Sequence, residues 1–373
     1  MTKAAELAKM GEVLSNSQVG RKNIIINGGM QIAQRGTSST GLGATDGYYT
    51  VDRFKMVHGA TSAGRYTMTQ SAITDLEGFS NGLKLQCTTA DTSIAAGELL
   101  MVSTVLEGLQ VQSLAATSTS TRAFTVSFYA KSNANRAISV ETNFADGTNR
   151  RAQTLHTIGT SWARYTMTVP AASSTSLPND NTHSFDLDLW IHAGSNYTSG
   201  TMSSSLAAHD NTNRAVGIGS FFSSTDNTLE LTGFQLEVGS QATPFEHRSY
   251  GEELQLCSRY YQTIIEHGIG QGGAAAITGY TASMYNSTYM MLPYAFRTEL
   301  RTFPTLISSD STEGFRMYRS GGSDVFDNLL TGTVRNKYAL ELYNNSDVSG
   351  TQGDSGYIQT NTSSAVLAVD AEL

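Results

Sequence analysis

Apolar and polar residues alternate along most of the chain between residues 23 and 247. The clearest alternating segments are FTVSFYAKS, AISVETNF, WARYTMTV, SFDLDLWIHAG and LELTGFQLEVG. A period of two is typical of β-strands that bury one face. Polar stretches rich in Ser, Thr, Asn and Gly, such as PAASSTSLPNDNTH, separate these segments and favour turns. We therefore predict a jelly-roll β-sandwich over residues 23–248.

The first 22 residues have a helical period instead. Small and apolar residues follow a 3-4-3 spacing that includes Leu7 and Leu14, which predicts a short amphipathic helix over residues 1–22. A helix of this length is marginal on its own in water. We expect it to be an anchor or assembly segment that docks on a partner or self-associates. A frayed tail is the alternative.

A second helix is predicted over residues 249–268. Ser249 and Glu252 have the spacing of a capping box at its start. An apolar stripe follows, formed by Leu254, Cys257, Tyr261 and Ile265. Alternating segments such as YALELYN and GYIQTN return afterwards and predict a smaller β domain over residues 269–373. The fold class is thus mainly β, with this helix as a rigid joint between two domains or within an assembly.

The composition suits globular β domains and argues against several partners. Of 373 residues, 39% are hydrophobic and 15% are charged, and the net charge is −8. Lys and Arg form no cluster that could grip phosphates, so nucleic acid is not an expected partner. No stretch approaches the roughly 20 apolar residues of a membrane-spanning helix, so membrane insertion is not expected. The N-terminus also lacks the apolar core of a secretory signal.

The reactive residue types form no catalytic pattern. Cys87 and Cys257, which stand far apart in apolar surroundings, are expected to be buried thiols. The seven histidines show no metal-binding spacing, and the chain has neither a nucleophile elbow nor a phosphate-binding glycine loop. A glycosidase carboxylate pair would leave no spacing to find, because the fold sets the distance between its members. We expect a protein that is not an enzyme and holds no cofactor.

Two acidic turns contain oxygen ligands of the kind that calcium prefers. They are PNDNTH, with Asp180 and Asn181, and TDGYYTVDRF, with Asp46 and Asp52. Ordinary Asx turns explain both stretches without an ion. We therefore predict no metal site.

The most suggestive surface comes from SFDLDLWIHAG. If its apolar residues face the core, Asp186, Asp188 and Trp190 share the opposite face of the strand. A tryptophan ring can stack on a sugar while carboxylates accept hydrogen bonds from its hydroxyl groups. The same period places Tyr129 on the outward face of another strand. We predict a glycan-binding surface here. The alternative is that Trp190 packs under a loop or into a subunit interface.

Several segments resemble proteins of one biological group. NIIINGGMQIAQRGTS, YYTVDRF, FTVSFYAKS, SWARYTMTVPA and GFQLEVGSQATPFEHRSYGEELQLCSRYYQ occur in the same order as in tail-fibre and other virion-surface proteins of tailed bacteriophages, especially marine and cyanobacterial ones. Separately, the order of NGGM, FTVSFYAKS and the W-x-R-Y segment resembles carbohydrate-binding-module jelly rolls. Met30 stands where that pattern usually has an aromatic residue, which weakens any transfer of ligand residues.

The resemblance implies a protein assembled in the host cytoplasm and displayed on the exterior of a virion. It implies a homotrimer that contacts other virion proteins through its N-terminus and attaches to a bacterial surface polysaccharide as a tail fibre or receptor-binding protein. The alternative is a purely structural role as a head fibre, capsid decoration or tail connector, which the short length favours. A glycan-binding module of a depolymerase is a third interpretation.

Overall fold

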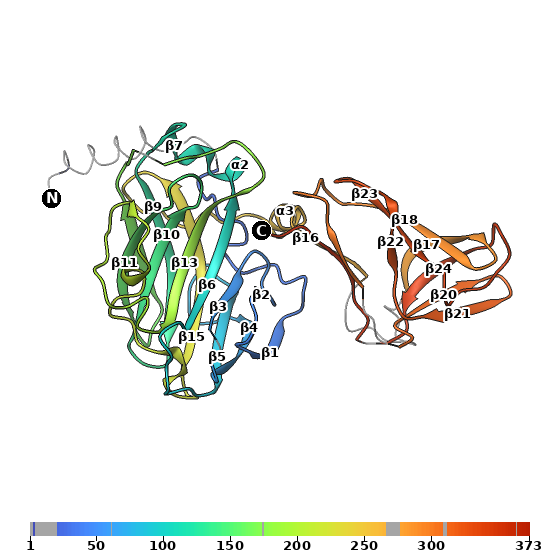
Figure 1. The fold of residues 1–373 in the computed structure, drawn as a ribbon, viewed down its shortest axis with the longest axis horizontal. Coiled ribbons are helices and arrows are strands. Elements are labelled where there is room, and N and C mark those ends of the chain that lie inside the picture. The colour runs from blue at the N-terminus through green and yellow to red at the C-terminus, as the bar shows by residue number, and fades with distance from the viewer. Residues whose placement is uncertain are drawn as a thin grey trace. The chain divides into compact units, whose positions relative to one another are not determined.

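The computed structural model describes Lys3 and residues 21–60, 62–173, 175–265, 277–308, 312–362 and 364–373. The chain divides into two compact units, Met1–Glu253 with Leu373, and Leu254–Glu372. Both units consist of antiparallel sheets with few helical residues, so the predicted mainly β fold is confirmed (Figure 1). The N-terminal helix predicted around Leu7 and Leu14 lies outside the described residues.

Two large antiparallel sheets form most of the described part of the first unit. One sheet has the strand order β1 (Ser38–Leu42), β4 (Arg65–Ala72), β5 (Asn81–Thr89), β15 (Thr228–Val238), β9 (Phe124–Ser132) and β12 (Ala163–Val169). The other has the order β14 (Ala207–Ala208), β11 (Arg150–Ile158), β10 (Arg136–Phe144), β13 (His183–Ala193), β6 (Leu99–Glu107), β3 (Lys55–Gly59) and β2 (Gly47–Tyr48). Figure 1 shows the long strands of this unit running side by side.

The connectivity of eight of these strands is that of a jelly roll. In chain order they are β5, β6, β9, β10, β11, β12, β13 and β15. One sheet contains the first, eighth, third and sixth strands as neighbours, and the other contains the second, seventh, fourth and fifth. Two interlocked Greek keys produce this order. The predicted jelly-roll sandwich is therefore confirmed.

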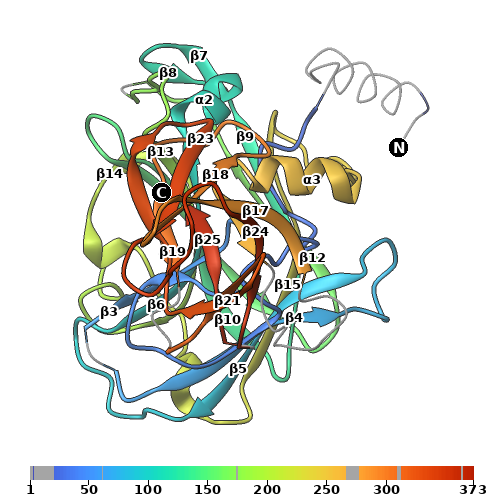
Figure 2. The same ribbon diagram turned by 90° about the vertical axis from the view of Figure 1, so that its right-hand side faces the viewer.

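The shorter elements of this unit lie in its connections. They are α2 (Gly108–Val111), η1 (Gln112–Leu114), β7 (Ala115–Thr117), β8 (Ser120–Thr121), η2 (Asn211–Asn213) and η3 (Phe221–Ser223). The β7–β8 hairpin and α2 occupy one end of the sandwich in both views (Figures 1 and 2). The connection between β13 and β15, residues 194–227, is the longest and contains β14, η2 and η3.

The core lies between the two sheets and follows the predicted alternation. Phe185, Leu187 and Leu189 of β13 are buried there. Phe185 packs edge to face against Phe144 and Phe124, with ring centroids 5.0 and 6.0 Å away. Such ring geometry adds to the free energy gained by burying the rings. The inward residues of SFDLDLWIHAG are therefore those that the period of two predicts.

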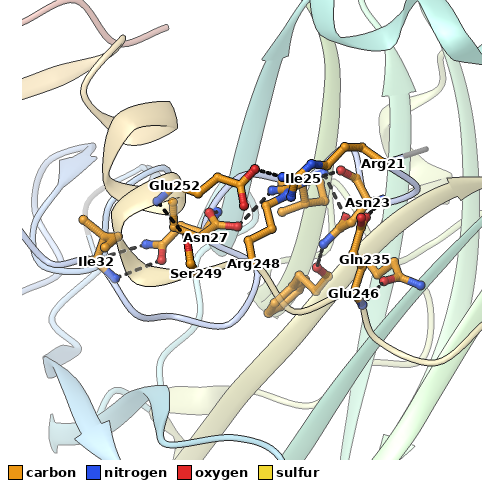
Figure 3. A network of polar contacts seen from close by, with 12 residues as sticks. Arg21, Asn23, Ile25, Asn27, Ile32, Gln235, Glu246, Arg248, Ser249 and Glu252 are labelled. Atoms are coloured by element: carbon orange, nitrogen blue, oxygen red, sulfur yellow. Dashed lines mark hydrogen bonds and ion pairs between the residues drawn. The ribbon is translucent and has the colours of Figure 1, made fainter. Parts of the chain in front are cut away.

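A clamp of hydrogen bonds and one ion pair joins the two ends of the sandwich sequence (Figure 3). The Glu246 carboxylate accepts hydrogen bonds from the backbone N–H groups of Lys22 and Asn23, at 2.8 and 2.7 Å. Arg248 pairs with Glu253 at 2.9 Å and also donates to the carbonyl of Ile25 at 3.0 Å. Residues 21–27 and 246–253 lie at opposite ends of this unit's sequence. These bonds therefore hold its first and last segments together.

The NGG turn in the same region is also structural. Asn27 has φ of 59°, and its side chain donates to the carbonyls of Ile32 and Asp52 at 2.8 and 2.9 Å. A Cβ atom on Gly28 would stand 2.1 Å from the carbonyl oxygen of Phe234, so the close backbone approach requires glycine. This turn therefore holds the N-terminal segment against β15.

The predicted helix over residues 249–268 is wrong for the described residues beyond Cys257, which are 258–265. The helix α3 spans Tyr250–Cys257, and the Ser249 hydroxyl accepts a hydrogen bond from the N–H of Glu252 at 3.4 Å, which is one of the two bonds of a capping box. Tyr261 and Ile265 lie instead in β16 (Tyr261–Ile265), which pairs with β25 (Leu367–Asp370). The segment YYQTII is aromatic and β-branched and buries both of its faces, so apolar positions occur at helical spacing by coincidence.

The described residues of the second unit form two sheets. The smaller one has the order β16, β25 and β19 (Thr305–Ser308). The larger one has the order β21 (Gly322–Phe326), β20 (Phe315–Arg319), β24 (Ser355–Thr360), β17 (Ile277–Asn286), β18 (Tyr289–Ala295), β23 (Ala339–Asn344) and β22 (Leu330–Arg335). One face of the larger sheet supplies core residues such as Met284, Leu292 and Ile358. Cys87 and Cys257, from the two units, are buried and not joined in a disulfide.

Candidate functional site

The outer face of β13 gathers the polar residues that the sequence placed there. In the pairing of β10 with β13, Asp186 lies opposite Asn143, Asp188 opposite Glu141, and Trp190 opposite Ser139. The side chains therefore share one face of the sheet, as the period of two predicts. This part of the predicted surface forms a continuous patch across two strands.

The patch is not exposed to solvent, because the connection formed by residues 194–227 covers it. Trp190 is 0% exposed, and the guanidinium of Arg214 lies 4.3 Å from its ring centroid. Tyr197 packs against the same ring with a centroid distance of 5.2 Å. The expectation that Trp190 presents an exposed platform for a sugar is therefore wrong. Its position under a loop is the alternative that the sequence left open.

Glu141 is the centre of a buried ionic network under this cover. Its carboxylate accepts hydrogen bonds from Arg151 at 2.6 Å, Arg214 at 2.7 Å, Gln153 at 3.0 Å and the Trp190 indole at 3.4 Å. Four donors satisfy a buried carboxylate that would otherwise be costly. The network ties the cover to β10 and β11, and its role is structural.

Asp188 experiences a different environment next to this network. Burial, together with the nearby carboxylates of Asp186 and Glu141, raises the pKa of Asp188 to about 7. Arg214 lies 3.8 Å from it and opposes this shift. Asp186 pairs at 2.7 Å with His183, and this contact raises the pKa of His183 above its usual value. Protonation here therefore changes the charge under the cover.

Tyr129 is not brought near these residues. It lies on β9, in the other sheet, with Phe79 at a ring distance of 5.2 Å and the Arg164 guanidinium 5.9 Å from its centroid. The four predicted glycan-binding residues thus occupy two different sheets. The predicted acidic turns are also engaged by protein groups: Asp180 accepts from Thr182 at 2.7 and 2.9 Å in an Asx turn.

An exposed aromatic surface occurs instead on the larger sheet of the second unit. Residues alternate between the core and solvent along its strands, as in β18 and β23. We call the solvent side the tyrosine face, after the five tyrosines that it carries: Tyr285, Tyr289, Tyr318, Tyr343 and Tyr357. Tyr285 is 63% exposed. Exposed aromatic residues on one face of a sheet are characteristic of binding surfaces.

The tyrosines form two groups of rings. Tyr289 and Tyr343 stack with centroids 5.1 Å apart and an angle of 8° between their planes, and Tyr285 lies 5.8 Å from Tyr289. Tyr318 and Tyr357 form the second group, with centroids 5.2 Å apart and an angle of 24°. The contacts between neighbouring rings restrict their motion, which lowers the entropy lost when a ligand binds.

A neutral floor connects the two groups. The strand pairing places Ser355, Ser283, Met291 and Tyr343 in one row across four strands. The hydroxyls of Ser283 and Ser355 are 3.3 Å apart. The tyrosine face therefore combines ring surfaces with hydroxyl groups and lacks a covering loop among the described contacts.

The sequence contains a signal for this surface that our interpretation did not use. YALELYN and the segment around TYMML alternate, and tyrosine falls on their polar positions. Only the register of β18 with β23 shows that Tyr289 and Tyr343 meet. Among the described residues, no helix is long and apolar enough to cross a membrane.

Comparison with known proteins gives weak likenesses. No family model and no curated protein matches the chain. The enzymatically active domain of tailspike protein 4 from bacteriophage CBA120 matches at 10% identity and a TM-score of 0.28 over 58% of this chain. The match covers 21% of the tailspike chain, so this protein aligns with about a fifth of it.

Carbohydrate-binding modules are also similar at the same level. TmCBM61 in complex with beta-1,4-galactotriose matches at 9% identity and a TM-score of 0.28, covering 59% of this chain and 100% of that one. The CBM22-1–CBM22-2 tandem domain of Paenibacillus barcinonensis Xyn10C matches at 10% identity and a TM-score of 0.27, covering 96% and 100%. Likenesses this weak say nothing about what this chain binds, and the resemblance to phage tail fibres stays a prediction.

Proposed function

We propose that the protein is a bacteriophage virion-surface protein of the tail-fibre or receptor-binding type that attaches to host glycan through the tyrosine face. The observation that carries the binding role is the presence of five tyrosines on the solvent side of one sheet, in two groups of packed rings. The virion assignment rests on the sequence resemblance.

The chemistry of the tyrosine face suits a sugar. The face of an aromatic ring carries negative charge density, which attracts the weakly positive C–H groups of a pyranose. Tyrosine and serine hydroxyl groups can donate and accept the hydrogen bonds that sugar hydroxyls require. No acid–base pair is needed for this role, so we propose binding without catalysis.

Multivalency makes a shallow site sufficient. A single weak site with millimolar affinity contributes about −4 kcal/mol. In the homotrimer that we propose, and in several copies on one particle, linked sites raise the effective affinity by roughly 10²–10⁴-fold. Attachment therefore needs no deep pocket.

The test is competition for adsorption. The purified full chain should bind host cells and block the phage, and replacing Tyr285 and Tyr357 by Ala together should abolish both effects. Tyr338→Ala is the matched control, because Tyr338 is similarly exposed (61%) in the same unit but lies outside the two ring groups. Circular dichroism should show that all variants remain folded.

Two outcomes would reject the proposal. A chain that binds neither cells nor extracted surface glycan has no receptor role. If that chain is nevertheless found in purified particles, it has the purely structural role of a head fibre, capsid decoration or tail connector. Equal loss of binding in the Tyr338 control would show that the tyrosine face is not the responsible surface.

A further inference from the structure

The charges around the tyrosine face define the class of glycan that it can hold. Outward positions of β17, β18, β20, β23 and β24 carry mainly hydroxyl, aromatic and aliphatic side chains; in the described part of these strands the charged ones are Arg316 and Glu341. Both interact with the tyrosines themselves. The Tyr289 hydroxyl donates to Glu341 at 3.3 Å, and the Arg316 guanidinium lies 5.6 Å from the Tyr318 ring centroid.

This arrangement provides no cluster of cations for acidic sugars. A carboxylate or sulfate on a ligand would need cationic partners on the floor between the ring groups to offset its desolvation. That floor consists instead of residues such as Ser283, Ser355 and Met291. Glu341 would repel an anion bound beside Tyr343. The face is therefore matched to an uncharged ligand.

The spacing of the two ring groups defines the length of that ligand. Tyr343 and Ser355 lie in one row, three strand spacings apart, and Tyr357 is two residues further along β24. Strand spacing and residue rise together place Tyr343 of the first group roughly 16 Å from Tyr357 of the second. A single sugar ring can stack on one group only. A chain of several sugars that crosses the strands can stack on both.

We infer that the ligand of the tyrosine face is an uncharged, extended glycan chain that lies across the strands and occupies both ring groups. This inference rests on the proposed function and gives the chemical class of its ligand. Binding both groups with one chain joins two weak contacts, so a chain that spans both should bind much more tightly than a disaccharide.

The experiment titrates the full chain with sugar oligomers of increasing length by calorimetry. The probes are β-1,4-linked glucose and N-acetylglucosamine oligomers from disaccharide to hexasaccharide, and α-1,4-linked galacturonic acid oligomers of the same lengths. We expect affinity for at least one uncharged series to rise with length and then level off, without dependence on salt concentration. The galacturonic acid series should bind at least about tenfold more weakly, which corresponds to about 1.4 kcal/mol.

A variant separates the two ring groups. Tyr357→Ala should remove the gain from length, so that disaccharide and hexasaccharide bind alike, while Tyr338→Ala keeps the gain. Tighter binding of the galacturonic acid oligomers, weakened by salt, would overturn the inference but leave glycan attachment intact. Cell binding that depends on Tyr285 without binding to any glycan would overturn the inference and the proposed function together. A change in the oligomeric state of the Tyr357 variant, measured by sedimentation, would show that copies of the chain cover this face and would also overturn it.

Discussion

The guanidinium of Arg214 lies over the indole ring of Trp190, 4.3 Å from its centroid, and both side chains bond to the same carboxylate of Glu141. This relationship assigns Trp190 to packing. It also makes the cover over the second sheet part of the fold, because Arg214, at 11% side-chain exposure, reaches a fully buried ring and a fully buried carboxylate.

Replacing Trp190 by Ala should destabilise the first unit strongly without affecting glycan binding. Truncating a fully buried tryptophan removes its packing and leaves a cavity, at a cost of about 3–5 kcal/mol. Urea unfolding of the variant measures the loss. Trp162→Ala is the comparison, since Trp162 is only half-buried, and should cost much less. A stable Trp190 variant that no longer binds glycan would instead show that the glycan site lies on the sheet that contains β13.

Replacing Glu141 by Ala should leave the buried Arg151 and the mostly buried Arg214 without their shared carboxylate. Breaking a buried ion pair on one side costs about 3–5 kcal/mol. The control is Glu230→Ala, because Glu230 forms a longer and more exposed pair with Lys131 at 3.7 Å. Exposed pairs contribute about 0–1 kcal/mol. Similar unfolding midpoints for the two variants would contradict the network's role.

The raised pKa of Asp188 predicts a pH dependence of stability. An unfolded aspartate ionises near pH 4, whereas in the folded chain Asp188 does so near 7. Between these values the folded state binds more protons than the unfolded state, so the contribution of Asp188 to stability is present below pH 4 and falls as pH rises to about 7.

Asp188→Asn should lack this decline, so the difference in stability between variant and wild type should change between about pH 4 and 7. Denaturant unfolding across the pH range measures it, with Asp180→Asn as a control because Asp180 is bonded within an exposed turn. An Asp188 variant whose pH profile is parallel to that of the wild type would show that Arg214 keeps the carboxylate ionised.

The NGG turn offers a matched pair of glycine substitutions. Gly28→Ala places a methyl group 2.1 Å from the carbonyl oxygen of Phe234, and overpacking of this kind costs roughly 1–3 kcal/mol. Gly29→Ala meets nothing closer than 3.7 Å and should be nearly neutral. Thermal unfolding of both variants provides the measurement. Equal midpoints would mean that the turn shifts away from β15 at little cost.

The period of two predicted well which side of a strand each residue occupies. It predicted poorly which distant residues that side contacts. It placed Phe185 in the core and Trp190 on the opposite side of the same strand, and both positions are correct. It could not show that Arg214, 73 residues away from Glu141 along the chain, folds back over that side. Loop placement depends on such distant contacts, which leave no period in the sequence. The same reason explains why the tyrosine face was missed.

The end of α3 shows a second limit of prediction from the sequence. Ser249 and Glu252 correctly predict its start, since capping involves neighbouring residues only. Its end depends on whether Tyr261 finds a strand partner, and that partner, Asp370, is more than a hundred residues away. After Cys257 the local apolar pattern favours a helix and pairing with β25 favours a strand. The strand pairing determines the structure that forms.

The clamp of Glu246, Arg248 and Glu253 on residues 21–27 has a mechanical consequence. A pull applied between Arg21 and Glu253 would load these short contacts, together with the hydrogen bonds that join residues 23–28 to β15, before it reached the other strands of the jelly roll. Most of the sandwich therefore lies outside the path along which the force passes. It can remain folded while the clamp is under tension.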